Sequence, residues 1–449
     1  MDLGKTQLKI LSFVQKDFKF HLKKNIDLSK NSFFYYALWG NCIGFEKLKL
    51  FLIGKTKFLS FFKVYFKDIF SICFGHDFEI FNFNARNKRK IILISSASKS
   101  NFYKDGSYTD RYFQINSKAF KNIIFYLDYL DKDLPERLDE NIVLFRLKKT
   151  SVLIGIFSFI MYFFKNFIKV ISFKSSVSEF TSQTIRAENL FQKISSLENI
   201  THYEKLILPY EGQPFQQFFV KEAKKINKDL LAIGYDHSAP HSLPFHLFHR
   251  DGAPDLLYMN GQSQIDHLIS YQNWPKNKIK LIPSLRYQNT DQSDFSNTIF
   301  LPYQIFNIEI VLNEIESFLK KSNLNSLNTI NIKTHPVAVN ENSQNKLKNG
   351  IQELFIKYSS KFDKSNKSQN ISFFIGPTTG VIVALEKDLR VVHICFDPIF
   401  DSYSSEMWPN LKTIKIGNNS LEYTLIKKNS FIKFGNDKNL FKNHFIDIK

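Results

Sequence analysis

The feature that most constrains the fold of this chain is a regular alternation of strand-like and helix-like segments between residues 298 and 396. Runs of β-branched and aromatic residues lie at 298–302, 329–332, 371–375 and 390–396, and amphipathic segments lie at 308–321, 344–362 and 379–387. Strands that alternate with helices form parallel sheets, because each helix carries the chain back to the same starting edge. The alternation predicts a Rossmann-like domain over residues 298–449.

The preceding part of the chain predicts a second domain of the same class. Strand-like runs lie at 91–95, 123–127, 142–147, 205–209, 230–234, 256–260 and 279–283, and helical segments lie at 216–225 and 262–271. A chain of 449 residues is long enough for two or three domains. We expect an α/β protein with two Rossmann-like domains that face a cleft, at 88–287 and 298–449, after an N-terminal extension of residues 1–87.

Two turns in the second predicted domain carry residues that suit anion binding. The first turn holds Lys333, His335 and Pro336, and the second holds Gly376, Thr378, Thr379 and Gly380. Ligands of open α/β sheets bind beyond the carboxyl ends of the strands, which is where both turns lie. Backbone N–H groups at the start of a helix, hydroxyls and cationic side chains all attract phosphate. The alternative is that both turns are ordinary loop punctuation.

The first predicted domain carries another group of polar residues at strand ends. Tyr210, Glu211 and Gln213 follow one strand, and His237 and Ser238 follow the next. A carboxylate beside a glycine at a strand end is well placed for acid–base chemistry in a cleft. The alternative for Glu211 is a helix-capping role near the positive end of a helix dipole.

These residues resemble those of known glycosyltransferases. Lys-x-His-Pro, followed by a turn rich in hydroxyl groups, resembles the nucleotide-sugar site of bacterial sialyltransferases, polysialyltransferase-like proteins and capsule glycosyltransferases with the GT-B fold. Tyr-Glu-Gly-Gln-Pro-Phe, a helix and then Gly-Tyr-x-His-Ser resembles a block of surface-carbohydrate glycosyltransferases, although Phe215 stands where relatives often have Trp. The resemblance runs from about residue 200 to the end of the chain.

The resemblance implies a metal-independent glycosyltransferase that moves a sugar from a nucleotide-activated donor, which is its substrate and not a cofactor, to a surface polysaccharide or lipid-linked acceptor. The His-Pro and Thr turns would hold the donor phosphate together with Arg286, which comes one position earlier than in the family. Glu211 would be the general base with His237 beside it, and the acceptor contacts would be Tyr210, Gln213 and Ser238. Two alternatives stay open: a glycerophosphate or alditol-phosphate transferase of similar fold, and a non-catalytic assembly protein at the membrane.

Two groups of residues look superficially like metal sites. Asp131, Lys132 and Asp133 have the Asp-x-Asp form of some metal-dependent transferases, and four histidines lie between residues 237 and 249. Pro135 and further acids follow the first group, which favours a solvated turn. Prolines separate the histidines, whereas zinc sites usually show tighter pairs and often Cys. We expect no metal at either place.

The formal net charge of +19 points to an anionic partner. The chain lacks zinc-finger spacing, an RNP-type strand and a KH-type loop, so nucleic acid is not the expected partner. Residues 151–173 are the most apolar stretch, but its charge-free part, 152–164, is shorter than the ~20 residues of a membrane span. Flanking lysines favour a helix that lies on an anionic membrane surface. A buried core helix and a true span are the alternatives.

Targeting and redox signals complete the expectations from sequence. The N-terminal residues alternate charged and apolar side chains without the continuous apolar run of a secretory signal. The three cysteines show no paired spacing, which favours a reducing compartment. We therefore expect a cytoplasmic protein that is peripheral on the inner face of the membrane.

Overall fold

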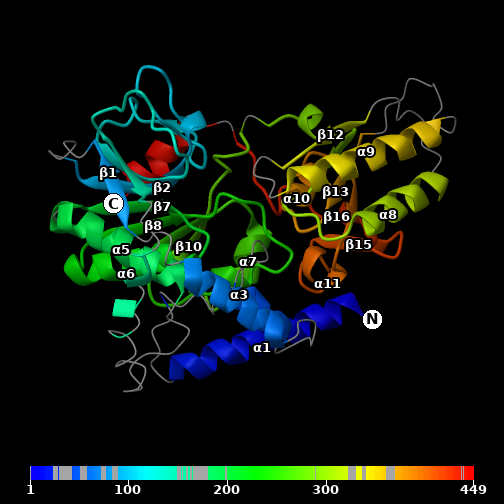
Figure 1. Ribbon diagram of the computed structural model, residues 1–449, viewed down its shortest axis with the longest axis horizontal. Coiled ribbons are helices and arrows are strands. Elements are labelled where there is room, and N and C mark those ends of the chain that lie inside the picture. Colours follow the sequence, from blue (N-terminus) through cyan, green and yellow to red (C-terminus); the bar gives the residue numbers. More distant parts are fainter. Residues whose placement is uncertain are drawn as a thin grey trace.

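The computed structural model describes residues 2–23, 29, 43–50, 58–71, 77–82, 89–148, 181–197, 200–288, 290–321, 330–335, 340–359, 370–435, 437 and 439–448, with 153, 155–157, 160–161 and 164. These parts form a mixed α/β fold with two large sheets, which lie side by side in Figure 1. The helices are α1 Leu3–Lys23, α2 Ile43–Leu48, α3 Phe58–Ser71, α5 Ser182–Leu197, α6 Pro214–Ile226, α7 Gln262–Tyr271, α8 Ile308–Lys321, α9 Glu341–Lys357, α10 Gly380–Glu386 and α11 Pro398–Asp401.

The first sheet has the strand order β1-β6-β5-β2-β7-β8-β9-β10. Its strands are β1 Phe78–Phe81, β2 Ile91–Ala97, β5 Ile123–Tyr129, β6 Ile142–Leu147, β7 Lys205–Pro209, β8 Leu231–Tyr235, β9 Leu256–Met259 and β10 Ile279–Leu281. All neighbours pair in parallel except β1, which runs antiparallel to β6. Both faces of this sheet are buried: in β2, Ile92 and Ile94 pack in one hydrophobic cluster, and Ile91 and Leu93 pack in another. Such strands read as continuous apolar runs in the sequence.

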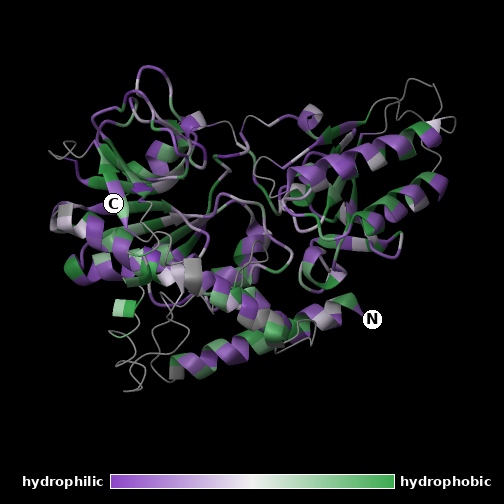
Figure 2. Cartoon of the chain, in the orientation of Figure 1, coloured by the Kyte–Doolittle hydropathy of each residue, from purple (hydrophilic) through white to green (hydrophobic). Residues whose placement is uncertain are grey.

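The second sheet has the order β12-β11-β13-β14-β16-β15. Its strands are β11 Thr298–Phe300, β12 Asn331–Lys333, β13 Ile371–Ile375, β14 Arg390–Ile394, β15 Leu411–Lys415 and β16 Ser420–Leu425. The first four are parallel, and the β15–β16 hairpin adds to β14 in antiparallel fashion. Hydrophobic residues gather on the strands, whereas the exposed helix α9 is largely hydrophilic (Figure 2).

The structure confirms the α/β class and the parallel strands that the sequence predicts. Every strand-like run predicted between residues 91 and 396 coincides with an observed strand, within a few residues at its ends. The β15–β16 hairpin and the antiparallel strand β1 were not predicted. Their sequences alternate polar and apolar residues over short stretches, which is typical of strands near the edge of a sheet.

The long helix α1 packs against segments from both halves of the chain. Near its start, the side chain of Gln7 donates hydrogen bonds to the carbonyls of Ile399 and Ser402, 2.9 and 2.8 Å away. Near its end, the ring of Phe18 stacks on Phe248 with centroids 4.5 Å apart. α1 runs beneath both sheets in Figure 1. Part of the predicted N-terminal extension is therefore built into the core.

The chain ends against the first sheet. A short π-helix, Lys442–Ile446, follows the second sheet, and Phe441 and Phe445 pack in the hydrophobic cluster of β2 and β5. The two ends of the chain consequently lie on opposite sides in Figure 1, the C-terminus beside the first sheet and the N-terminus beside the second. The chain thus crosses between the two sheets once at 282–297 and again after residue 425.

Only a few positions of the predicted apolar helix at 151–173 belong to the described residues. Positions 153, 155–157, 160–161 and 164 are helical, and the remainder of that prediction lies outside the described part of the chain. Among the helices that the structure describes, none combines the length and hydropathy needed to cross a bilayer.

Candidate functional site

The first sheet has a topological switch point between β2 and β7. From β2 the chain adds β5 and β6 on one side, and from β7 it adds β8, β9 and β10 on the other. The connections on the two sides leave room at the carboxyl ends of the central strands, which is where ligands of such sheets bind. Glu211 follows β7 and His237 follows β8, so both lie at this edge.

Glu211 and His237 form a close pair. Oε1 of Glu211 lies 3.3 Å from Nε2 of His237, and the Glu211 side chain is 26% exposed. Gln213 donates from Nε2 to the other carboxylate oxygen at 2.5 Å, and the backbone N–H of Glu211 donates to Gln216. Burial raises the pKa of Glu211, while the Gln213 hydrogen bond and the charges of nearby arginines oppose that shift. A carboxylate with a raised pKa suits a general base near neutral pH.

His237 is almost fully buried and is held in place by aromatic packing. Its ring lies 4.2 Å from the ring of Tyr112, centroid to centroid. Burial, with the charges of Arg286 and Arg111, lowers the pKa of His237 well below its ordinary value, so the ring is neutral at physiological pH. Its Nδ1 has no hydrogen-bond partner within the described part of the chain. A neutral imidazole carries one N–H and leaves its other ring nitrogen as an acceptor, and Nε2 is the nitrogen that lies next to Glu211.

Asp236 lies beneath this pair and is also buried. One carboxylate oxygen accepts hydrogen bonds from the backbone N–H and the hydroxyl of Ser238, at 3.2 and 3.0 Å, and the other oxygen accepts from Gln264 at 3.4 Å. Burial raises the pKa of Asp236 to about 7. Ser238, predicted as a cleft residue, is thus occupied in closing the turn after β8. Gln264 was not predicted as a site residue, because it lies within a stretch that forms the helix α7.

Two arginines flank the Glu211–His237 pair. Arg111 donates to the hydroxyl of Tyr112 at 2.5 Å and to Ser96 at 3.3 Å, and its guanidinium lies 4.7 Å from the Tyr112 ring centroid. Arg286 is exposed, and its charge acts on both Glu211 and His237. Arg286, predicted from the sequence to contact the donor phosphate, lies after the last strand of the first sheet and belongs to the group at that sheet. Arg111 and Tyr112 belong to no recognisable sequence motif, so they were not predicted as site residues.

Tyr210 and Gln213 have different surroundings. Tyr210 is fully buried, and its hydroxyl accepts a hydrogen bond from Gln217 at 3.0 Å. It is a core residue, so we leave it out of the site. Gln213 caps α6 and also contacts Glu211, as described above. Between them, Gly212 adopts φ +64°, and a Cβ there would lie 2.1 Å from the carbonyl oxygen of His246, so only glycine fits this turn.

The second sheet has its own switch point between β11 and β13, and the Thr turn follows β13. Gly376 has φ +69°, and its carbonyl accepts from the buried ring of His393 at 2.8 Å. The Thr378 hydroxyl accepts from the backbone N–H of Gly380 at 3.1 Å, and Thr379 precedes α10 as its N-cap. The turn is a rigid feature, because glycine, histidine and threonine groups fix it together.

Lys333 and His335 lie at the same edge as the Thr turn but not next to it. β11 separates their strand, β12, from β13. Two interstrand spacings put the two turns roughly 10 Å apart. His335 is exposed and its ring lies 5.5 Å from that of Tyr303, which follows β11. Lys333 donates to the backbone carbonyl of Asp294 at 2.7 Å. Pro336 lies outside the described residues.

Tyr403 links the two groups of strand ends. Its buried hydroxyl lies 2.8 Å from the carbonyl oxygen of Pro240, in the loop after β8, and 3.3 Å from the carbonyl oxygen of Thr378. The loop after β8 also shares a hydrophobic cluster with α10, through residues such as Leu243 and Val381. The loops that follow β8 and β13 are therefore connected by the Tyr403 hydroxyl and by this shared hydrophobic cluster.

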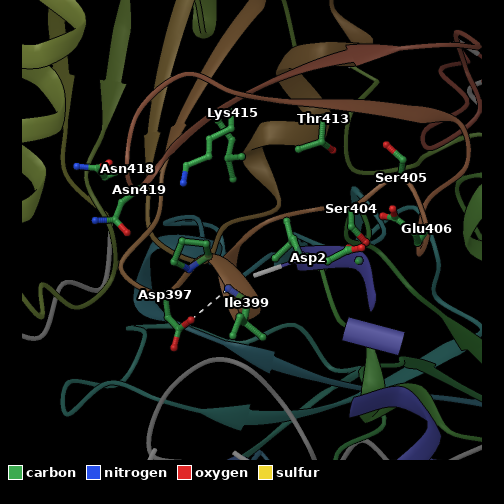
Figure 3. A pocket seen from close by; sticks show the side chains of 14 residues that line it. Asp2, Asp397, Ile399, Ser404, Ser405, Glu406, Thr413, Lys415, Asn418 and Asn419 are labelled. Carbon is green, nitrogen blue, oxygen red and sulfur yellow. Dashed lines mark hydrogen bonds between the residues drawn. The ribbon is translucent and has the colours of Figure 1, made fainter. Parts of the chain in front are cut away.

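A pocket of about 490 Å³ lies at the end of β14, the next strand after the Thr turn (Figure 3). Its size is typical of small-molecule sites. Hydroxyl, amide and charged groups line it, among them Asp397, Ser404, Thr413, Lys415 and Asn419. Asp397 accepts from the backbone N–H of Ile399 at 3.1 Å, as the dashed line in Figure 3 shows. None of the residues predicted from the sequence as site residues lines this pocket.

Metal binding finds no support in the described residues. No three His, Cys, Asp or Glu side chains in the described ranges converge on one point. In the histidine group that resembles a metal site, burial lowers the pKa of His241 to about 4. In the Asp131–Asp133 turn, the Asp131 carboxylate accepts a hydrogen bond from the backbone N–H of Lys99 at 2.6 Å. These groups take part in loop structure.

Comparison with known proteins adds no family to these observations. Neither the protein-family models nor the curated proteins contain a match to this chain.

Proposed function

We propose that this protein is a glycosyltransferase whose two sheets form the halves of a GT-B-like enzyme facing a shared cleft. It would transfer a sugar from a nucleotide-activated donor to a surface polysaccharide or a lipid-linked glycan. The contact of Tyr403 with Pro240 and Thr378 carries this proposal, because it joins the loops that follow β8 of the first sheet and β13 of the second. A transferase needs such an arrangement, since donor and acceptor must meet between their binding sites.

The second half would hold the donor. The Thr378 turn offers hydroxyl and backbone groups, and His335 offers an exposed imidazole on the strand two places away. A separation of roughly 10 Å suits a ligand with two polar parts, such as a nucleoside joined to a phosphate, better than a single phosphate ion. Groups held in this way orient the donor and stabilise the negative charge that develops on the departing phosphate.

The first half would activate the acceptor. One carboxylate oxygen of Glu211 would take the proton of the acceptor hydroxyl while the hydroxyl oxygen forms its bond to the anomeric carbon. The bond from that carbon to the donor phosphate breaks, and the nucleotide leaves with the bonding electrons. His237 would keep the carboxylate oriented through its 3.3 Å contact. A positioned base of this kind contributes roughly 10²–10⁴-fold to a rate.

Nucleotide binding tests the proposal. Isothermal calorimetry on the purified full chain with CMP, UDP, GDP and CDP should show one nucleotide that binds. At 100 times its Kd, that nucleotide should raise the free energy of unfolding by about 2.7 kcal/mol. Thr378→Val and His335→Ala should each weaken that binding. Thr424→Val, an exposed position on β16, is the matched control for Thr378 and should leave it unchanged. Absence of binding by a folded sample would refute the donor site.

We further propose that the protein works as a peripheral protein on the inner face of the cytoplasmic membrane. Within the described part of the apolar stretch, large side chains are exposed along one helical stripe, at Leu153, Phe157, Ile160, Met161 and Phe164. Their spacing of three and four residues puts them on one face. Lysines flank the stretch on both sides, and the chain carries a formal net charge of +19. An apolar face with surrounding cations suits an anionic lipid surface.

A further inference from the structure

Arg111 and Arg286 are two exposed cations that form no ion pair within the described part of the chain. Four other arginines, Arg89, Arg146, Arg186 and Arg390, each form an ion pair with a carboxylate. Neither Arg111 nor Arg286 lies within ion-pair distance of an acid in the described residues. An arginine left unpaired beside a candidate catalytic carboxylate is a typical recognition element for carboxylate or phosphate, because its planar fork matches their geometry.

Arg111 is held by a built arrangement of side chains. The hydroxyls of Tyr112 and Ser96 accept its hydrogen bonds at 2.5 and 3.3 Å, and these two hydroxyls lie 3.1 Å apart. Ser96 belongs to β2, the strand on one side of the switch point, and Tyr112 packs on His237. The guanidinium is therefore oriented by Tyr112, the residue that also packs on the His237 ring, and this lowers the entropy lost when a ligand binds.

Arg286 comes from a different part of the chain, the segment after β10. The backbone N–H of Leu285 donates to the hydroxyl of Tyr235 at 2.9 Å, which ties this segment to the end of β8. Tyr235 directly precedes Asp236 and His237. The charge of Arg286 acts on Glu211 as well as on both of these residues. Two independent segments thus bring cations to the same carboxylate.

The charges of this group do not balance. Arg111 and Arg286 contribute two positive charges, whereas His237 is neutral and burial disfavours the charged forms of both Glu211 and Asp236. Asp236 is buried beneath and already holds hydrogen bonds from Ser238 and Gln264. A bound anion would supply the missing negative charge without displacing any of these contacts.

We propose that Arg111 and Arg286 together bind an anionic group, a phosphate or a carboxylate, of the substrate that reaches Glu211. The inference rests on the proposed function for the identity of that substrate, but the anion site itself does not depend on it. The anion could come from a charged sugar or phosphorylated acceptor, or from the donor nucleotide. An anion from either source would contact the two arginines in the same way. Only an anion of the donor nucleotide would also need the Thr378 turn for its binding.

Chemical labelling of arginine tests the anion site directly. Phenylglyoxal reacts with exposed guanidinium groups, and peptide mass spectrometry of the full chain gives a separate rate for each arginine. We expect inorganic phosphate to slow the labelling of Arg111 and Arg286 together, by about tenfold at ten times its Kd. Arg137 is the control, since it is exposed and forms no ion pair with a described residue. Equal rates with and without phosphate, or equal protection of Arg137, would overturn the proposal.

Two variants and two further ligands complete the test. In Arg286→Gln, the protection of Arg111 by phosphate should fall several-fold, because one anion no longer has both partners; unchanged protection would overturn a shared site. If glucuronate protects the two arginines in the parent chain and also in Thr378→Val, the anion belongs to the acceptor. If a nucleotide protects them in the parent chain but not in Thr378→Val, the anion belongs to the donor. Nucleotide binding without arginine protection would refute only the anion site, whereas phosphate protection without any nucleotide binding would refute only the transferase.

Discussion

The carboxylate of Glu211 lies 3.3 Å from Nε2 of His237, and the two residues follow neighbouring parallel strands of the first sheet. Burial favours the neutral form of both groups, so it raises the pKa of the Glu211 carboxyl and lowers the pKa of the His237 imidazole. The pair therefore favours a neutral histidine beside a carboxyl group that ionises above the ordinary range of glutamate. This relationship gives the first sheet a candidate base, and it leads to specific expectations for variants of the surrounding residues.

Asp236 makes stability depend on pH. Its pKa is raised from 3.8 to about 7, so between these values the folded chain binds a proton that the unfolded chain does not. The free energy of unfolding therefore falls as pH rises through this window, by up to about 4 kcal/mol for an isolated group. Asp236→Asn removes the ionising group, and its amide can pair with Gln264 after that side chain rotates.

We expect urea unfolding at pH 5.5 and pH 8.0 to show a smaller decrease in stability for Asp236→Asn than for the parent chain. Asp229→Asn is the control, because Asp229 is exposed, and it should keep the parental decrease. A decrease that is identical in all three proteins would show that Asp236 ionises normally.

The packing of α1 predicts a large effect from a residue in the N-terminal segment. Phe18 is fully buried and stacks on Phe248, so Phe18→Ala removes a buried ring and leaves a cavity that costs about 3–5 kcal/mol. Phe20, two residues later, is 53% exposed, and Phe20→Ala should change stability by no more than about 0.5 kcal/mol. Thermal and urea unfolding measure both. Equal effects would contradict the docking of α1.

Tyr403→Phe tests the link between the two sheets. The substitution removes the hydroxyl that lies 2.8 Å from the Pro240 carbonyl and 3.3 Å from the Thr378 carbonyl. A buried carbonyl left without its donor costs about 1–3 kcal/mol, and nucleotide affinity should fall as well if the Thr378 turn depends on the link. Urea unfolding and calorimetry give the two values. Tyr103→Phe, at an exposed position, should change neither.

The exposed stripe at 153–164 predicts binding to anionic vesicles. Phe157→Asp puts a charge on the apolar face and forfeits roughly 1.5–3 kcal/mol of Phe burial, so partitioning onto phosphatidylglycerol vesicles should fall about tenfold or more. Phe306 is equally exposed at 65% but lies beside the second sheet, and Phe306→Asp should bind as the parent chain does. Cosedimentation measures the bound fraction. Equal losses in both variants would point to a general charge effect.

The sequence was most informative where strands are buried on both faces. The runs at 142–147 and 371–375 were predicted with the bounds that the structure gives, because strands that are buried on both faces are almost continuously apolar. The hairpin of β15 and β16 escaped prediction because one of its faces is partly exposed and carries Lys412, Glu422 and Thr424. Pairing with β14, not local composition, makes these residues a strand.

The candidate site was predictable only in part. Glu211, His237 and the Thr378 turn follow strands, so a rule about strand ends is enough to find them. Arg111 and Tyr112 reach the site through a loop that contains no motif, and their contact with His237 joins positions far apart in the chain. Tyr210 also follows a strand and was predicted to contact the acceptor, but its side chain is buried in the core. Local sequence does not decide which way such a side chain points.

Turnover of the nucleotide-sugar tests the central role of Glu211 most directly. With the sugar conjugate of whichever nucleotide binds and no other acceptor, we expect the parent chain to transfer the sugar to water and release free nucleotide. Glu211→Gln should bind the donor equally well but react about 10²–10⁴-fold more slowly. Glu204→Gln, an exposed position just before β7, should react at the parental rate. A Glu211→Gln variant that retains the parental rate would contradict the assignment of Glu211 as the base.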